Sequence, residues 1–434
     1  MTKVAPFVAK EMIPPSAPPA SEVGAIKWVR ENLFSSIPNA ILTLLTLYII
    51  YQALMIVIPW VMNGVWGTEG EGPNSLDECR QQLEGAVGGC FAVIRERWQQ
   101  LLFGNYPKDE LWRPTVAFFG LVLAALPVMF VKLPRNLLIF TGIFPFVTYW
   151  LLWGGTIWAP LLFLGMVVLG YIAYSRLVAQ SFFMGIIGFV AVVFIGGLYL
   201  VGPIANGLHS IIPIGLSSVE SREIGGFILN FILGITCVSL SLPLGIVLAL
   251  GRQSDLPIIK GICVVFIEFI RGVPLITLLF VASVMLAYFL PPDANFDIMV
   301  RVIIMITLFA AAYIAEAIRG GLAALPKGQY EAGDSLGLDY WQSMRLIILP
   351  QALKISIPSI VNIAIGLFKD TTLVSIISMV DLLGMIQQRI FNTTEWFGVY
   401  WELLGFAALL FFIICYGISQ YSQWLERQLA TDHR

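Results

Sequence analysis

Charged side chains and histidine are scarce in this chain of 434 residues. Only 12% of the residues are Asp, Glu, Lys or Arg, about half the fraction typical of a soluble globular protein, and the sequence contains 2 histidines. No Cys/His cluster has the spacing of metal ligands, which argues against a metal site. The formal net charge of -2 provides no basic surplus, so nucleic acid is not an expected partner.

Apolar residues are abundant instead and make up 58% of the chain. Several apolar runs reach about 20 residues, the length that a helix needs to cross the hydrocarbon core, and they lack the alternating pattern of a transmembrane barrel. We therefore predict an all-α, polytopic membrane protein with ten transmembrane helices. The predicted segments are 37–61, 114–131, 137–153, 159–175, 182–201, 227–250, 272–290, 298–317, 353–377 and 403–424.

The distribution of Lys and Arg predicts the orientation, because cytoplasmic loops carry an excess of these residues. With the N-terminus inside, the connections that hold Arg252, Arg271 and Arg319 face the cytoplasm, as does the C-terminus. The loop 63–113 then lies outside. Residues 1–34 are polar and proline-rich and lack the features of a secretory signal, so we expect a disordered cytoplasmic tail.

The cysteines fall into two groups. Cys237, Cys263 and Cys415 lie in apolar stretches, where we expect them to pack in the core. Cys79 and Cys90 lie in the polar loop on the predicted outer side, where a disulfide can persist. The sequence leaves open whether these two cysteines are bridged or are free thiols.

Two five-helix halves are predicted, 35–205 and 206–434, separated by a connection over 202–226 that contains several glycines and serines. The N-terminal half carries few intramembrane charges and the C-terminal half carries many. Charges inside a membrane are costly, so they mark the C-terminal half as the functional one.

A polar segment, residues 318–352, lies between the eighth and ninth predicted helices on the cytoplasmic side. It contains Glu331-Ala332-Gly333-Asp334, then Gly337, and ends at Ile347-Ile348-Leu349-Pro350. The small residues would let a short helix seat against another protein, and Glu331 and Asp334 would offer carboxylates to it from one helical face. Pro350 suits the first turn of the next helix.

This segment resembles the signature of the permease subunits of bacterial ABC importers, which is Glu-Ala-Ala, three residues, Gly, nine residues and Ile-x-Leu-Pro. Every spacing agrees, and Gly333 replaces the second alanine. The resemblance implies a coupling helix that fits a cleft on an ATPase and transmits its closure to the membrane helices. The chain has no G-x-x-x-x-G-K-[ST] loop, so we expect no catalytic site or cofactor of its own, with ATP and Mg bound by a partner ATPase.

Further motifs narrow the resemblance to the polar amino-acid branch of these permeases. Residues 268–275 and 369–373 match that branch, and the resemblance covers about residues 225–430. The additional N-terminal helices are similar to those of the enlarged permeases of general L-amino-acid importers and of glutamate/glutamine/aspartate/asparagine importers. Such subunits lie in the bacterial inner membrane among its lipids. They pair with a second permease, two ATPase subunits and a periplasmic amino-acid-binding protein.

Polar residues in the ninth and sixth predicted helices are candidates for the translocation path. Our hypothesis is that Asp370, Thr371 and Thr372 line or support a translocation cavity. Lys369 could serve the same path or form a structural ion pair, and Asn230 could bond a neighbouring helix as easily as a ligand.

Two glutamates at helix ends, Glu268 and Glu316, each precede an arginine by three residues, Arg271 and Arg319. This spacing favours local salt bridges.

An ion-coupled secondary transporter or channel is the alternative function, because composition and intramembrane charge alone allow either class. The segment from Glu331 to Pro350 favours the ATP-driven importer. A membrane-embedded enzyme is disfavoured because the sequence contains no recognisable catalytic constellation.

Overall fold

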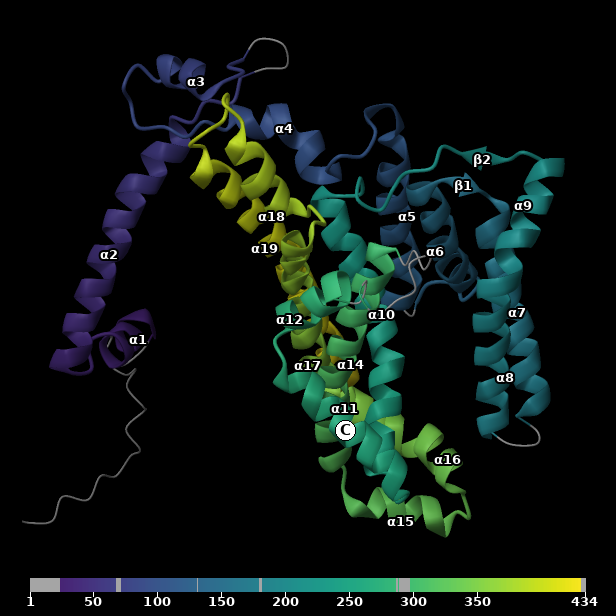
Figure 1. The fold of residues 1–434 in the computed structure, drawn as a ribbon. Coiled ribbons are helices and arrows are strands. Elements are labelled where there is room, and N and C mark those ends of the chain that lie inside the picture. The colour runs from purple at the N-terminus through teal and green to yellow at the C-terminus, as the bar shows by residue number, and fades with distance from the viewer. Residues whose placement is uncertain are drawn as a thin grey trace, which may run out of the picture. The chain divides into compact units, whose positions relative to one another are not determined.

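The computed structural model of this chain describes residues 24–67, 72–130, 132–178, 182–285, 288 and 297–430. These residues are almost entirely helical (Figure 1). Within them, β1 (Gly155–Thr156) and β2 (Gly215–Leu216) form a short antiparallel pair. The predicted all-α class is confirmed.

The chain divides into two compact units. The first unit comprises the residues up to Val65 together with Cys79–Cys90, and the second comprises Trp66–Glu78 and Phe91–Arg434. In the first unit, α1 (Gly24–Asn32) precedes α2 (Ile37–Met62). Ser36 caps α2 by accepting a hydrogen bond from the backbone N–H of Asn39 at 3.4 Å.

The helix α1 lies within residues 1–34, for which the sequence predicts a disordered tail. Its sequence is short and polar, but the Asn32 side chain donates a hydrogen bond to the Trp28 carbonyl at 2.9 Å. Lys27 and Glu31 also form an i,i+4 ion pair at 3.8 Å, and both contacts favour the helical turn. Residues 1–23, which include the prolines of the predicted tail, lie outside the described residues.

Cys79 and Cys90 form a disulfide in the first unit, with their Cα atoms 6.0 Å apart. The structure therefore decides between the two alternatives left open by the sequence. The residues before Cys90 are also fastened to the end of α2, because Gly89 donates a hydrogen bond to the Trp60 carbonyl at 2.8 Å and accepts one from Val65 at 2.9 Å. Closing a loop of this length stabilises the folded chain by about 3 kcal/mol in the chain-entropy model.

The second unit contains most of the helices. After α3 (Leu76–Gln82), which spans the division between the units, the helices are α4 (Ala92–Phe103), α5 (Trp112–Met129), α6 (Leu137–Trp153), α7 (Trp158–Leu177), α8 (Phe182–Ile195), α9 (Val201–Ile211), α10 (Gly226–Gln253), α11 (Pro257–Gly272), α12 (Leu275–Phe280), α14 (Ile298–Ala323), α15 (Lys327–Ser335), α16 (Tyr340–Ser343), α17 (Leu349–Asp370), α18 (Leu382–Gly384) and α19 (Tyr400–Ala430).

Eight helical spans in the described residues are long and apolar enough to cross a membrane, or nine if one bent pair counts as a span. The shorter apolar helix α6 matches the predicted segment 137–153. Each of the ten predicted segments thus has a helical counterpart. The predicted fourth segment, which is short, corresponds to the full-length helix α7.

The predicted division of the chain near residue 205 lies inside a helix. The fifth predicted segment, 182–201, corresponds to α8 and a π-helical turn, Gly196–Leu200, and the helix then continues as α9 to Ile211. The connection to α10 is therefore shorter than predicted. Glycines such as Gly202 and Gly207 are compatible with a membrane helix and do not by themselves end it.

The predicted seventh helix, 272–290, corresponds to α12 and its continuation, whereas the preceding helix, α11, lies outside the ten predicted segments. α11 ends at Gly272, α12 begins at Leu275, and the two helices meet at an angle of 102°. Pro274 lies at the break, where it cannot donate a backbone hydrogen bond to a continuing helix. Helix continues through a π-turn to Met285, whereas residues 286, 287 and 289–296 lie outside the described residues.

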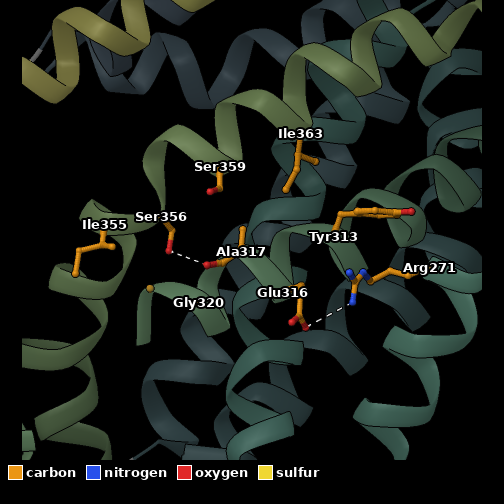
Figure 2. Close-up of a pocket in the computed structure, with 10 residues that line it drawn as sticks. Arg271, Tyr313, Glu316, Ala317, Gly320, Ile355, Ser356, Ser359 and Ile363 are labelled. Atoms are coloured by element: carbon orange, nitrogen blue, oxygen red, sulfur yellow. Dashed lines mark hydrogen bonds and ion pairs between the residues drawn. The ribbon is translucent and has the colours of Figure 1, made fainter. Parts of the chain in front are cut away.

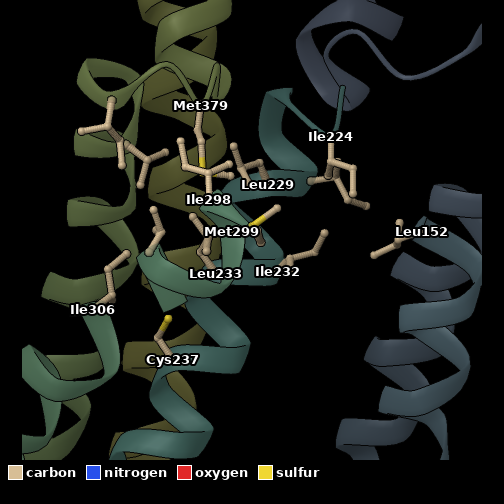
Figure 3. Close-up of a cluster of buried hydrophobic side chains, with 14 of the residues drawn as sticks. Leu152, Ile224, Leu229, Ile232, Leu233, Cys237, Ile298, Met299, Ile306 and Met379 are labelled. Atoms are coloured by element: carbon tan, nitrogen blue, oxygen red, sulfur yellow. The ribbon is translucent and has the colours of Figure 1, made fainter. Parts of the chain in front are cut away.

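One hydrophobic core joins the two predicted halves. It contains Leu229 and Leu233 of α10, Met299 and Ile306 of α14, and Leu152 of α6 (Figure 3). The N-terminal helices α4 to α6 are therefore packed onto the C-terminal helices and are not an independent body.

At the start of α10 the backbones approach closely, and three glycines make this possible. A Cβ atom on Gly104 would lie 2.5 Å from the Cα atom of Gly225. Gly226 has a φ of +64° and donates a hydrogen bond to the Val380 carbonyl at 2.9 Å. The end of α4 is thereby held against the first turn of α10.

The disulfide predicts the number of reactive thiols in the denatured protein. We expect three maleimide adducts before reduction, on Cys237, Cys263 and Cys415, and five after reduction. Intact-mass spectrometry would count the adducts. A variant with both Cys79→Ser and Cys90→Ser should show three under both conditions, and five adducts on the unreduced wild-type chain would contradict the bridge.

Candidate functional site

The predicted polar segment 318–352 is mostly helical. Residues 318–323 are the last turns of α14, α15 follows Pro326, and a π-helical turn, Met344–Ile348, connects α16 to α17. Helices α15 and α16 lie together at one end of the second unit (Figure 1). We call this the α15 end.

Gly337 ends α15 by its backbone conformation. Its φ is +69°, its N–H bonds the Asp334 carbonyl at 3.0 Å, and the N–H of Leu338 bonds the Gly333 carbonyl at 3.2 Å. These two bonds form a Schellman motif, which favours glycine at this position. A Cβ atom on Gly337 would meet nothing within 4 Å, so its smallness serves the turn within this chain.

Gly333 serves a contact within the chain. It is buried, and a Cβ atom there would lie 2.3 Å from the Ser343 hydroxyl oxygen. The absent side chain thus lets α15 pack directly against α16. Asp339 and Gln342 begin α16 with a capping box, in which each side chain accepts a hydrogen bond from the other residue's backbone, at 2.8 and 3.1 Å.

The Ile-x-Leu-Pro residues anchor the segment to the bundle. Ile347 and Leu349 pack against a core cluster that includes Ile348 and Leu322. Pro350 has no N–H and its ring crowds the preceding turn. The turn before it is π-helical, and the N–H of Leu349 donates a hydrogen bond to the Met344 carbonyl.

Tyr330 joins the same cluster from α15. Its burial raises the pKa of the Tyr330 hydroxyl.

The outward side of α15 carries the remaining signature residues. Glu331, Ala332 and Asp334 are exposed, and Leu336 is 72% exposed. No salt bridge involves Glu331 or Asp334 within the described part of the chain. This side therefore exposes two carboxylates and an apolar side chain.

Charged residues at the α15 end form a network of five side chains. Glu316 of α14 lies 2.5 Å from Arg319, 3.1 Å from Arg252 of α10 and 3.7 Å from Arg271 of α11. Glu268 of α11 pairs with Arg252 at 2.9 Å and with Arg271 at 4.0 Å. The two predicted local pairs exist, but they are parts of a network that also includes Arg252 and joins three helices.

An open cavity of about 380 Å³ lies beside this network (Figure 2). Its wall includes Arg271 from α11, Tyr313, Glu316 and Gly320 from α14, and Ser356 and Ser359 from α17.

Lys369 and Asp370 are the last two residues of α17, which ends before residue 377, the end predicted for the ninth helix. A 3-10 turn, Thr371–Ile377, follows. Lys369 is exposed and Asp370 is half-buried. The Thr372 hydroxyl donates back to the Lys369 carbonyl at 2.9 Å and thereby satisfies a carbonyl at the helix end.

Asn230 and Thr371 belong to a buried network that links α10, α17 and α18. The Asn230 amide donates to the Thr371 hydroxyl at 2.9 Å and to the Asp381 carboxylate at 3.0 Å, and all three side chains are fully buried. Asn230 therefore bonds neighbouring segments, which was one of the two alternatives for this residue. Both residues support the end of α17 from inside the bundle.

Asp381 was not identified from the sequence. Its carboxylate caps α18 by accepting a hydrogen bond from the Gly384 N–H at 2.9 Å. Burial raises the pKa of the Asp381 carboxyl, and the hydrogen bonds from Asn230 and the backbone amides of Gly384 and Leu383 oppose this rise. The available sequence signal was an aspartate placed as an N-cap before Leu382-Leu383.

Comparisons with known proteins place this geometry in a family. Residues 241–428 match the model described as "Binding-protein-dependent transport system inner membrane component". The glutamate/glutamine/aspartate/asparagine transport system permease protein BztC of Rhodobacter capsulatus is 52% identical over 99% of both chains. The inner membrane amino-acid ABC transporter permease protein YhdY of Escherichia coli is 36% identical over 96% of both chains.

Among solved structures, one titled "Crystal structure of an amino acid ABC transporter with histidines" is 30% identical. The match covers 47% of this chain and 92% of that chain, with a TM-score of 0.42.

The family is shown by similarity over nearly the whole length of two permeases, and the helical membrane-spanning fold agrees with it. The chain belongs to the family of amino-acid ABC transporter permeases.

Proposed function

We propose that this chain is the translocating subunit of an ATP-driven importer and that α15 is the helix held by its ATPase. The observation that supports the proposal is the arrangement of α15. Its inner side is fixed by Gly333 and Tyr330, whereas the side chains of Glu331, Asp334 and Leu336 are exposed. The alternative, an ion-coupled transporter or channel, gives no reason for such a helix.

The proposed assembly contains two ATPase subunits that bind ATP and Mg, a second homologous permease and a periplasmic amino-acid-binding protein. The α15 end faces the cytoplasm, as do both termini, and the segment with the disulfide faces the periplasm. The named substrates of the Rhodobacter relative are glutamate, glutamine, aspartate and asparagine. We extend this substrate class to the present chain.

The helix α17 provides a route from the ATPase to the substrate path. It continues from the π-turn beside α15 and ends at Asp370. Because α15 packs on α16 through Gly333, a displacement of α15 would carry the start of α17 with it. In this proposal Asp370 and Thr372 contact the translocation path, Lys369 lies beside them, and Asn230 and Thr371 hold the turn that positions them.

The first prediction concerns the energy source. In vesicles that contain the complete complex, L-glutamine uptake should require ATP inside the vesicle and should persist when an ionophore collapses the ion gradients. Radiolabelled uptake with and without ATP measures this. Uptake driven by an ion gradient in the absence of ATP would support the secondary transporter and refute the proposal.

The second prediction tests the seat of α15. Gly333→Leu should displace α15, since its side chain would overlap Ser343, and overpacking of this kind costs about 1–3 kcal/mol. We expect reduced co-purification of the ATPase and reduced uptake. Gly328→Leu is the matched control on the same helix, because a Cβ atom there meets nothing within 4 Å. Equal ATPase binding by the two variants would show that the packing of α15 does not matter for coupling.

The third prediction concerns Asp370. Asp370→Asn keeps the shape of the side chain and removes its charge, and uptake should fall by roughly tenfold, the cost of one hydrogen bond to a charged group. Glu220→Gln, at an exposed position before α10, is the control. Both variants should reach normal levels in the membrane and retain the ATPase. Unchanged uptake by Asp370→Asn would exclude its carboxylate from the path.

A further inference from the structure

The cavity at the α15 end has the features of a binding site for a small charged solute. Its volume of about 380 Å³ lies within the range of small-molecule pockets. The side chains that surround it are contributed by α11, α14 and α17, so the cavity is formed only when these three helices are assembled (Figure 2).

Arg271 is a wall residue with unused hydrogen-bonding capacity. Its nearest carboxylate oxygens are 3.7 Å away on Glu316 and 4.0 Å away on Glu268, both too long for hydrogen bonds. Its Nε atom is buried without a hydrogen-bond partner, and its guanidinium group lies over the Tyr313 ring at 5.4 Å. The ring holds the guanidinium in place, and the Arg271 side chain as a whole remains 32% exposed.

The charge of the network favours an anion. Three arginines, Arg252, Arg271 and Arg319, face two glutamates, so the network carries one excess positive charge. Arg252 and Arg319 both lie within hydrogen-bond distance of Glu316, and Arg271 does not. Arg271, on the cavity wall, thus has the longest contacts to carboxylates in this network, and a guanidinium group can bind a carboxylate through two hydrogen bonds.

Hydrogen-bond acceptors adjoin this cation. Glu316 lines the cavity beside Arg271, and Gly320 lies in the last turn of α14, where the helix dipole is negative. A carboxylate on Arg271 and an ammonium group directed at Glu316 would match the two neighbouring charges of an α-amino acid.

We propose that this cavity binds the α-amino-acid head group of the transported solute at the ATPase side of the permease, with Arg271 holding the α-carboxylate. The inference rests on the proposed function, because it names a site for the same substrate class. It adds a site on the release side, apart from Asp370 at the far end of α17. A solute in the cavity would contact α14, which ends at Ala323, and α15 begins close by at Lys327. A displacement of α14 by the bound solute would therefore be transmitted to α15.

The test compares two probes on the purified full-length chain in lipid nanodiscs. L-glutamine carries the complete head group, and 4-aminobutanamide is the same molecule without the α-carboxylate. Calorimetry should detect binding of L-glutamine, with 4-aminobutanamide at least about tenfold weaker. Equal binding of the two probes, or displacement of L-glutamine by inorganic phosphate at the same concentration, would overturn the assignment.

Variants locate the binding at this cavity. Arg271→Gln should weaken L-glutamine binding about tenfold without changing that of 4-aminobutanamide, and Arg271→Lys should be intermediate. Lys260→Gln, an exposed position on the same helix, should bind as the wild type does.

Gly320→Leu tests the site without disturbing the charges. A Cβ atom there meets nothing within 4 Å, so the leucine can enter the cavity without a clash and should block L-glutamine. Gly328→Leu, outside the cavity, should not. If Arg271→Gln misfolds, L-glutamine binding by Gly320→Leu and the comparison of the two probes on the wild type still test the cavity site. Unaltered L-glutamine binding by both Gly320→Leu and Arg271→Lys would refute the cavity site, even where ATP-driven uptake is normal. Uptake that does not depend on ATP would refute the proposed function instead.

Discussion

Glu316 is the residue on which the α15 end of the second unit depends. Its carboxylate lies within 4 Å of three guanidinium groups, from α10, α11 and α14 itself. Arginines near a membrane interior need a counter-charge, and a lone carboxylate there would be equally unfavourable. Pairing them fixes the ends of three helices beside one another. The last turn of α14, from which α15 continues, is thus held in a defined position.

Near the opposite end of α17, the buried carboxylate of Asp381 is compensated without a cation. Among the described residues, Asp381 has no Lys or Arg partner and is satisfied by the Asn230 amide and by backbone N–H groups. Asn230 also donates a hydrogen bond to Thr371 and accepts one from the Leu382 N–H. One side-chain amide thus connects α10 to the turn after α17 and to the start of α18. With 22 residues, α17 is about 33 Å long, and near its start the Ser356 hydroxyl donates a hydrogen bond to the Ala317 carbonyl of α14 at 3.1 Å. Polar contacts therefore hold α17 near its start and just after its end, in addition to its apolar packing.

The sequence predicted the membrane helices well because span length and apolar content are local properties. It predicted the α15 segment because the spacing from Glu331 to Pro350 is also local. The 102° bend between α11 and α12 was missed because apolar length does not reveal it, and the local signal was Pro274, which cannot continue the helix before it. Asp381 was missed because its partner Asn230 lies 151 residues away. Cys79 and Cys90 could be assigned to the same loop from sequence, but only their separation in the fold decided the bridge.

The small residues of the α15 signature also have roles within this chain. Gly333 is required by Ser343 of the same chain and Gly337 by a left-handed turn, while Ile347, Leu349 and Pro350 serve the core and the π-turn. Most of the signature therefore builds a rigid helix and fixes its position. What it leaves for recognition is the outward set of Glu331, Ala332, Asp334 and Leu336. A partner surface that complements this set would combine cationic or N–H donor groups with an apolar socket for Leu336.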